Sequence, residues 1–497
     1  MTHQLNRITA LMLIGFLLVA VALGFWSVIR ADDLLARDDN ARTVIAEQAI
    51  QRGAIWDRHG DLLAYSEADA KGVMQRVYPL PETASAVGYY SFTYGAAGIE
   101  AAYDAELRGE AWISEWEALV DDTLHRTLTG GDVRATIDRG VQDAAATALG
   151  DRSGAVVVVE VPSGRVLAMV SQPSFDPNTL DEQWDDLTTD LETSPLLNRV
   201  TTGLYQPGGA LQTVILAALV GAYTDLPNSG AAVLNMVVPN AREPVEVNGL
   251  TLTCLEGTPE RDLTLAEAYV YGCPVTFAHA LNESQNDSPV PTAERLWERF
   301  AAFGLLAAPD LAGFDTAIAE TLPDPFTAET PADVLRAALV GQGDLTVTPL
   351  QMAQIVAAIA NRGTAIPLHL VDAIRPPDAD QDEDAWQLIA TPASEPALMR
   401  SDVAAALRLA MLEAAAQSPQ VSQARRGDLV LYGHTALSFA GPPMTPYAWF
   451  VGFVDQTGRH TGGSDVTAIA VVVVIEDEAD PGTAASVAGA AFAAASE

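Results

Sequence analysis

The residues that first suggest chemistry lie at the Pro207-Gly208-Gly209 turn, which leads directly into an apolar stretch that predicts a helix. The first turn of a helix carries free N–H groups and a partial positive charge, which favour an attacking hydroxyl and an oxyanion. Here Gly209 has no side chain, and Gln212, one turn later, cannot take up a proton. The pattern is either a nucleophile site without its nucleophile or a plain glycine turn before a core helix.

Two cysteines are the other candidates for reactivity. Cys254 and Cys273 lie 19 residues apart and could form a disulfide outside the cytoplasm, or remain free, packed thiols. A thiol needs a nearby base to attack at neutral pH, and His279 or His434 could serve Cys273 in that way. No His or Cys cluster has metal-ligand spacing, so we expect neither a metal nor a cofactor.

Composition excludes some functions. The chain has 497 residues, enough for two or three domains, and 65 acidic against 27 basic residues give a net charge of −38. Such a surface repels nucleic acid, so nucleic-acid binding is set aside. Every basic position except Lys71 is Arg, and the pKa of Arg stays above about 12. A lysine or arginine base is therefore not expected anywhere near Gly209.

The N-terminal region predicts a membrane anchor. Residues 8–29 are almost wholly apolar and carry no charge, which is long enough for a helix of about 20 residues to span a bilayer. Trp26 near its end suits the membrane interface, and Arg7 precedes it. We expect an uncleaved single-pass anchor, with the N-terminus in the cytoplasm and the bulk of the chain outside.

Strand and turn signals organise the chain as far as a change of character near Asp151. Residues 52–64 read as strand, turn, strand, and Arg52, Asp57 and Arg58 within them are interpreted as a local ion-pair cluster. Residues before the boundary should form a β-rich domain of their own.

The region after the boundary predicts an α+β domain. Residues 154–171 read as a β-hairpin, and the unbroken apolar run at 156–159 predicts a central strand covered on both faces. Helices are expected after the boundary at 263–282, 292–303, 346–361 and 484–496, and strands at 447–454 and 466–476. Before the boundary, helices are expected at 95–109 and 139–149 and a strand at 133–137. This order implies an antiparallel sheet sandwiched by helices.

Six segments together resemble one family, the class B penicillin-binding proteins. They are RGAIWDRHGDLLA at 52–64, GAAGIEAAYDAELRG at 95–109, GAVVVVEVPSGRVLAMVSQPSFDPN at 154–178, LLNRVTTGLYQPG at 196–208, GQGDLTVTPLQMAQIVAAIANRG at 341–363 and AWFVGF at 448–453. The resemblance implies a cytoplasmic stub and transmembrane anchor at 1–30, a pedestal or dimerisation-type domain at 31–150, and a D,D-transpeptidase-like domain at 151–497.

The same resemblance shows where the chain departs from its family. Members carry Ser-x-x-Lys, Ser-x-Asn and Lys-Thr-Gly motifs, in which the Ser attacks a D-Ala-D-Ala peptide or a β-lactam and the Lys accepts its proton. Alignment on the neighbouring residues puts glycine and glutamine at the first motif, and glycine and proline at the second. At the third motif, which the family extends to Lys-Thr-Gly-Thr-Ala, only Thr435 and Ala436 match. The degenerate positions are Gly209, Gln212, Gly272, Pro274, Tyr432, Gly433 and His434.

Three functions remain open at this point. The first is a catalytically inactive transpeptidase homologue that acts as scaffold or regulator in peptidoglycan synthesis or cell division, with a glycan polymerase or an active paralogue as partner. The second is an acyl-transfer enzyme using residues outside the family's motifs. The third is a non-covalent sensor of muropeptide, stem peptide or β-lactam, with Thr213 and Thr435 as residual cleft residues; a strand edge can hold an extended peptide by its backbone alone.

Overall fold

The structure is a computed structural model that describes residues 2–25, 48–70, 72–114, 116–117, 126–222, 229–280, 292–318, 324–379, 383–390, 397–441, 444–456 and 466–496. Most of the linker that the charged stretch at 32–51 predicts, together with Lys71, lies outside these residues.

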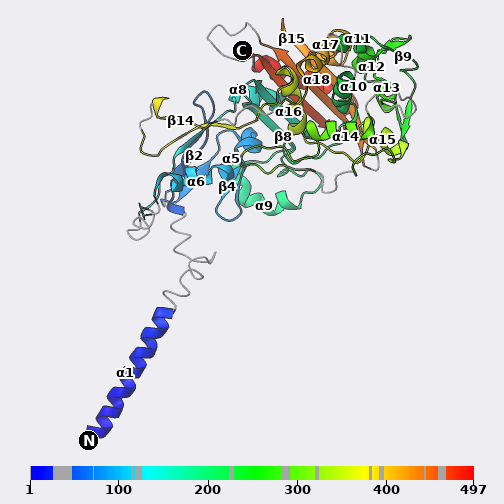
Figure 1. Cartoon of the computed structure of the whole chain (residues 1–497). Coiled ribbons are helices and arrows are strands. Elements are labelled where there is room, and N and C mark those ends of the chain that lie inside the picture. The colour runs from blue at the N-terminus through cyan, green and yellow to red at the C-terminus, as the bar shows by residue number, and fades with distance from the viewer. Residues whose placement is uncertain are drawn as a thin grey trace.

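The N-terminal helix α1 spans Thr2–Gly24 and extends away from the rest of the molecule (Figure 1). It contains much of the apolar stretch at 8–29, whose last residues lie outside the described part. Of the helices in the described ranges, none reaches the length and apolarity that a membrane crossing requires. The anchor therefore stays a prediction.

A six-stranded mixed sheet forms the core of the pedestal, with strand order β14-β13-β6-β1-β2-β3. Its strands are β1 Ile55–Trp56, β2 Leu62–Ala68, β3 Met74–Val77, β6 Asp132–Ala135, β13 Val371–Arg375 and β14 Gln387–Leu388. The antiparallel pair β1–β2 confirms the strand-turn-strand prediction at 52–64. Because β13 pairs with β6, the sheet takes strands from both sides of the predicted boundary near Asp151.

The predicted ion-pair cluster within residues 52–64 is wrong. Arg52 instead pairs with Glu100 and Asp104, and Arg58 pairs with Glu160 of the second domain. Asp57 accepts backbone N–H groups of its own turn. All three residues lie outside strands β1 and β2, and contacts with segments far along the chain decide the partners of Arg52 and Arg58.

Short elements complete the pedestal. They are the 3-10 helices η2 Pro81–Thr83 and η3 Glu110–Trp112, the helices α4 Ala84–Val87, α5 Gly98–Ala102 and α6 Asp104–Arg108, and the hairpin strands β4 Tyr89–Ser91 and β5 Gly95–Ala97. The helix predicted at 95–109 is thus two short helices that meet at Tyr103.

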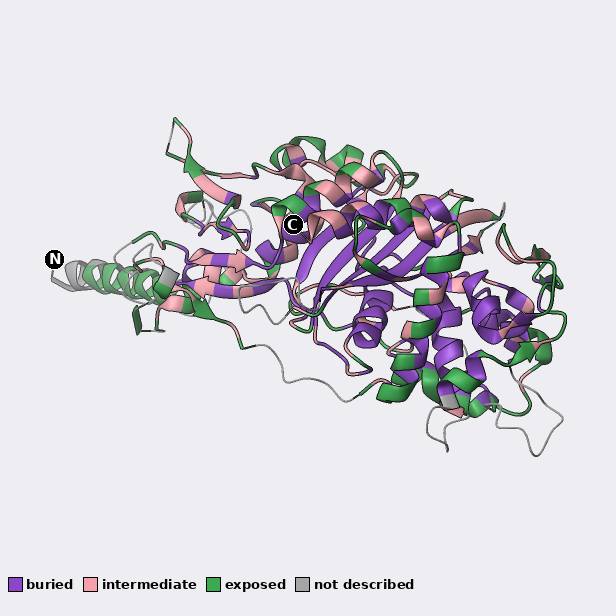
Figure 2. Cartoon of the chain, turned by 90° about the horizontal axis from the view of Figure 1, so that it is seen from above, coloured by how far each residue is buried: buried purple, intermediate pink, exposed green. Residues whose placement is uncertain are grey.

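The second domain is built on a five-stranded antiparallel sheet with strand order β15-β16-β17-β7-β8. The strands are β7 Gly154–Val161, β8 Val166–Gln172, β15 Val430–Ala440, β16 Thr445–Asp455 and β17 Ala468–Glu476. The β7–β8 hairpin is the one predicted at 154–171, and every residue of β7 is buried. In Figure 2 the strands of this sheet form a buried layer inside the molecule.

Helices and short strands surround the sheet. They are α8 Arg139–Leu149, η4 Pro177–Thr179, α9 Leu180–Thr189, η5 Gly208–Leu211, α10 Gln212–Ala222, α11 Ser229–Leu234, β9 Val237–Val238, β10 Val245–Val247, β11 Leu250–Leu252, β12 Leu263–Thr264, α12 Leu265–Val270, α13 Pro274–Ala278, α14 Ala293–Ala302, α15 Ala332–Leu339, α16 Pro349–Ala360, η6 Glu383–Ala385, α17 Ser401–Gln417, η7 Val421–Ala424 and α18 Pro481–Ala494.

Each face of the sheet packs in its own hydrophobic cluster. Along β7, Val157 and Val159 join the cluster that contains α16, whereas Val156 and Val158 join the one that contains α18. This alternation follows from the two-residue repeat of a strand, and it explains why the run at 156–159 is apolar throughout. The predicted antiparallel sheet between layers of helices is confirmed.

The helix predicted at 263–282 is broken in two. A capping box between Thr264 and Glu267 starts α12. The helix ends before Gly272, whose φ of +57° suits glycine, and Pro274 then begins α13. The break leaves Tyr271 and Gly272 in a turn, and the Gly272 carbonyl accepts from Gln212 at the start of α10.

Candidate active site

The candidate site is centred on the turn that starts η5 and α10. Gly208 has a φ of +49°, and a Cβ atom built there would lie 2.2 Å from the carbonyl oxygen of Leu437 in β15. Only glycine allows the turn to approach the strand so closely. The turn is thereby pressed against β15, with α10 running away from it into the core.

Gly209 lies opposite Ala436 of β15, and the methyl group of Ala436 occupies the space between them. A Cβ atom built on Gly209 would lie 3.0 Å from the Cβ of Ala436 and 3.6 Å from the side-chain nitrogen of Gln212. The side-chain amide of Gln212 donates to the carbonyl oxygen of Gly272 at 3.4 Å. Ala436 therefore uses the room beside Gly209 that a serine side chain would need, and Gln212 links the first degenerate motif to the second.

The second degenerate motif is held by a disulfide. Cys273 is bonded to Cys254, with the two Cα atoms 4.1 Å apart, so neither sulfur is a thiol in this structure. His279, the first candidate base for Cys273, is exposed at the end of α13. The Cys–His alternative thus has no free nucleophile here.

The third degenerate motif contacts the turn at Gly209 through one of its residues. His434, and not Tyr432, faces the turn: its Nε2 donates to the carbonyl oxygen of Gly209 at 3.2 Å. The ring of Tyr432 instead stacks on Phe453 with centroids 4.6 Å apart. Of the positions predicted for this motif, His434 is therefore the one hydrogen-bonded to Gly209, whereas Tyr432 packs on Phe453.

His434 is a neutral, enclosed ring. Complete burial lowers its pKa from 6.5 to about 4, and its ring stacks on Tyr269 with centroids 4.1 Å apart. Since Nε2 donates to Gly209, the lone pair is on Nδ1, which is buried and has no partner among the described residues. A base must reach the proton that it removes, and this nitrogen cannot.

The two threonines predicted as residual cleft residues lie apart. Thr213 is buried in α10, where its hydroxyl contacts the hydroxyl of Tyr269 at 3.0 Å. Thr435 is buried on the face of β15 opposite His434, and its hydroxyl has no partner within the described ranges. Neither threonine has a base beside it.

A small hollow of about 100 Å³ opens beside Gly209. Its lining residues are Gly209, Gln212, Thr251, Leu252, Thr253, Leu255, Gly272, Pro274, Val340, Gln342, Ala436, Leu437 and Phe439. None of these carries an ionisable group, so the hollow offers backbone groups, amides and two hydroxyls. It could hold a polar molecule by hydrogen bonds, but it supplies no general base for acyl transfer.

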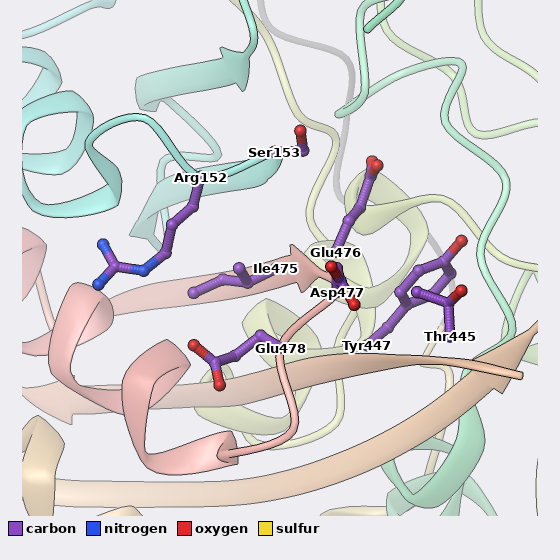
Figure 3. A pocket seen from close by; sticks show the side chains of 8 residues that line it. All are labelled: Arg152, Ser153, Thr445, Tyr447, Ile475, Glu476, Asp477 and Glu478. Atoms are coloured by element: carbon purple, nitrogen blue, oxygen red, sulfur yellow. The ribbon is translucent and has the colours of Figure 1, made fainter. Parts of the chain in front are cut away.

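A larger cavity of about 480 Å³ lies at the ends of β16 and β17, and Figure 3 shows the side chains that line it. Glu476 and Glu478 point in different directions in this view, and Glu476 accepts hydrogen bonds from Arg199 and Tyr205. No group of three or more His, Cys, Asp or Glu residues suited to a metal ion occurs in the part of the chain that the structure describes. We assign this cavity no catalytic role.

Introducing a serine at the nucleophile position tests whether geometry or chemistry is missing. We expect Gly209→Ser to cost about 1–3 kcal/mol, because its Cβ lies 3.0 Å from that of Ala436, and to form no penicillin adduct, because Gln212 is no base. Urea unfolding of the full chain in detergent and intact mass after incubation with penicillin G measure both effects. Gly209→Ala is the matched control: an adduct with the serine variant alone would mean that a base exists at this site.

The five-stranded sheet between layers of helices and the turn at Gly209 together define a transpeptidase architecture. The chain matches the family model "Penicillin binding protein transpeptidase domain" at residues 154–222 and 271–497, and "Penicillin binding protein A dimerisation domain" at residues 52–133. The chain therefore belongs to the penicillin-binding protein transpeptidase family.

Its similarity to individual proteins extends over nearly the whole chain. It is 31% identical to the peptidoglycan D,D-transpeptidase PbpA of Mycolicibacterium smegmatis, over 97% of this chain and 95% of that protein. The PbpA of Mycobacterium tuberculosis is 30% identical over the same shares. The structure of penicillin-binding protein A from M. tuberculosis as an imipenem acyl-enzyme covers 91% of this chain and 100% of that one, with a TM-score of 0.74 and 28% identity.

Some residues of the site could not be found from the sequence. Ala436 as the neighbour of Gly209, and Tyr269 as the ring beneath His434, lie on segments far apart in the chain. No local pattern marks either contact.

Proposed function

We propose that this protein is a catalytically inactive penicillin-binding protein that takes part in peptidoglycan synthesis as a scaffold or regulator. The observation that carries the proposal is the hollow beside Gly209, which has no ionisable group in its lining. The nucleophile position is Gly209, and the base position is the buried Gln212, whose side-chain amide is hydrogen-bonded to the carbonyl oxygen of Gly272. An acyl-enzyme needs an activated nucleophile, and this site has none.

The packing around the site supports retention of the fold for a purpose. Ala436 lies against Gly209, and His434 donates to the Gly209 carbonyl, so the turn stays packed against β15 in an intact hydrophobic core. A chain under no selection would accumulate core substitutions that cost stability. By resemblance we propose a stem peptide, a glycan polymerase or an active paralogue as partner, at the outer face of the membrane with α1 as anchor.

Covalent labelling tests the proposal. The full chain in detergent, incubated with a fluorescent penicillin, is expected to give no labelled band and no mass increase. Penicillin-binding protein A of M. tuberculosis, which has been solved as a penicillin G acyl-enzyme, is the positive control. A stoichiometric adduct would overturn the proposal, and peptide mapping would identify the nucleophile.

One hydroxyl at the hollow could support the alternative of an acyl-transfer enzyme. Thr251 donates to a carboxylate oxygen of Glu246 at 2.6 Å. Both side chains are exposed, however, so water competes for this hydrogen bond and weakens it. If an adduct appears, Thr251→Ala would abolish it in this alternative and leave it unchanged in any other.

A further inference from the structure

A cluster of partly exposed aromatic side chains lies far from the candidate active site. We define the aromatic patch as Tyr89, Tyr94, Phe175 and Trp184. The rings of Tyr94 and Trp184 are stacked, with centroids 4.2 Å apart and planes 10° from parallel. Tyr89 meets Phe175 and Trp184 edge to face, at 5.9 and 6.3 Å.

The patch joins three segments that are far apart in sequence. Tyr89 and Tyr94 belong to the β4–β5 hairpin of the pedestal, Phe175 follows β8, and Trp184 is in α9, which lies beside β4 in Figure 1. Asn178 fixes this junction, because its amide exchanges two hydrogen bonds of 2.9 Å with the backbone of Tyr78. The rings are therefore positioned before any ligand arrives.

The polar atoms of these rings are free to bind a ligand. Within the described residues, no partner occurs for the hydroxyls of Tyr89 and Tyr94 or for the indole N–H of Trp184, and none of these three residues is buried. A groove of about 220 Å³ runs beside the patch, with Tyr89, Phe175 and other aromatic and small residues in its lining. Exposed aromatic groups next to a groove mark a binding surface.

The charges around the patch decide what kind of ligand fits. Helix α9 carries four exposed carboxylates and no basic residue; they are Asp181, Glu182, Asp185 and Asp186. A second copy of this chain, or any acidic polymer, would bring like charges together. A neutral ligand rich in hydroxyl and amide N–H groups would instead donate to these carboxylates and stack the C–H face of its rings on the aromatic groups.

We propose that the aromatic patch binds a neutral, N-acetylated glycan chain, with Trp184 and Tyr94 as the stacking platform and Asp181 as a hydrogen-bond acceptor. Asp181 lies three residues before Trp184 and so on the same face of α9. The choice of glycan rests on the proposed function in peptidoglycan synthesis, since every second sugar of that polymer is N-acetylglucosamine, a neutral β-1,4-linked N-acetylhexosamine. The site would dock the protein on a glycan strand without using the transpeptidase cleft.

The test uses chitohexaose, a soluble β-1,4-linked N-acetylglucosamine hexamer, and the full chain in a detergent without a sugar head group. We expect saturable binding, followed by tryptophan fluorescence and by saturation-transfer NMR. Trp184→Ala should weaken it about tenfold, because one stacking ring is lost. Trp184→Phe should weaken it less and Asp181→Asn several-fold. Trp116→Ala, which removes a tryptophan that is 71% exposed outside the patch, is the matched control and should bind as the unaltered chain does.

Two binding results would overturn the proposal: no saturable binding by the unaltered chain, or equal binding by the Trp184→Ala and Trp116→Ala variants. A change of oligomeric state in Trp184→Ala, measured by analytical ultracentrifugation, would also overturn it, because the patch would then be a self-association surface. Thermal unfolding of each variant checks the fold, and Trp184→Phe keeps the test valid if the alanine variant unfolds. Penicillin labelling is independent of this result, so failure of the glycan site and failure of the inactive-enzyme proposal remain distinguishable.

Discussion

Replacing Glu100 by Gln is expected to lower the free energy of unfolding of the pedestal by about 3–5 kcal/mol, one of the two largest effects that we predict. Glu100 is fully buried, and its carboxylate accepts from Arg52 at 2.9 Å and from Arg76 at 2.5 Å. Tyr78 donates to the same carboxylate at 3.2 Å. The substitution keeps the shape but leaves the buried guanidinium of Arg76 without a counter-charge and that of Arg52 with Asp104 alone.

The control for this prediction is the second acidic partner of Arg52. Asp104 also pairs with Arg52, at 2.6 Å, but its side chain is 43% exposed. Water can replace that carboxylate, so Asp104→Asn should cost no more than about 1 kcal/mol. Urea unfolding of the full chain in detergent, followed by circular dichroism, measures both variants. Equal effects of the two substitutions would contradict the assignment of Glu100 as the centre of the cluster.

The same cluster should contribute to acid sensitivity. Burial would raise the pKa of Glu100, but the charges of Arg76 and Arg52 outweigh it and hold that pKa below its ordinary value. A carboxyl whose folded pKa is lowered gives stability above its unfolded pKa of about 4.3, and this is lost as pH falls through the folded value. In Glu100→Gln that part of the acid dependence should be missing.

Replacing His434 by Gln is expected to remove about 3 kcal/mol of pH-dependent stability. The pKa of His434 is lowered from 6.5 to about 4 by burial, and each unit of difference corresponds to about 1.4 kcal/mol. Because the folded pKa is the lower one, stability is complete above pH 6.5 and is lost progressively as pH falls towards 4. The unaltered chain should therefore lose more stability than the variant between these two values.

The measurement is a pair of denaturation series, for the unaltered chain and for His434→Gln, at pH 7.5, 6.5, 5.5 and about 4.5. At pH 7.5 the variant should be somewhat less stable, because the stack on Tyr269 is lost while an amide can still donate to Gly209. The difference should shrink or reverse as pH falls. If the unfolding free energies of the two proteins changed in parallel with pH, the pKa of His434 would not be lowered by folding. The assignment of His434 as a buried, neutral ring would then be wrong.

Local patterns predicted the elements that have one strong periodicity. The β7–β8 hairpin, the helix α16 with its early Pro349, and the strands β16 and β17 lie where their apolar runs and turn residues put them. These elements depend on neighbouring residues, whose preferences are visible in sequence. The break between α12 and α13 differs from the single helix expected there. Gly272 and Pro274 interrupt the helix although the residues around them are apolar.

By itself the sequence determined the family and the order of the two matched domains, since these are properties of which residues follow one another. Tertiary structure alone decided the partners: Arg52 with Glu100 rather than Asp57, His434 rather than Tyr432 at Gly209, and β13 in the pedestal sheet. The physical reason is distance along the chain. A contact between residues tens or hundreds of positions apart is selected by packing and charge in the folded molecule, and no local preference records it.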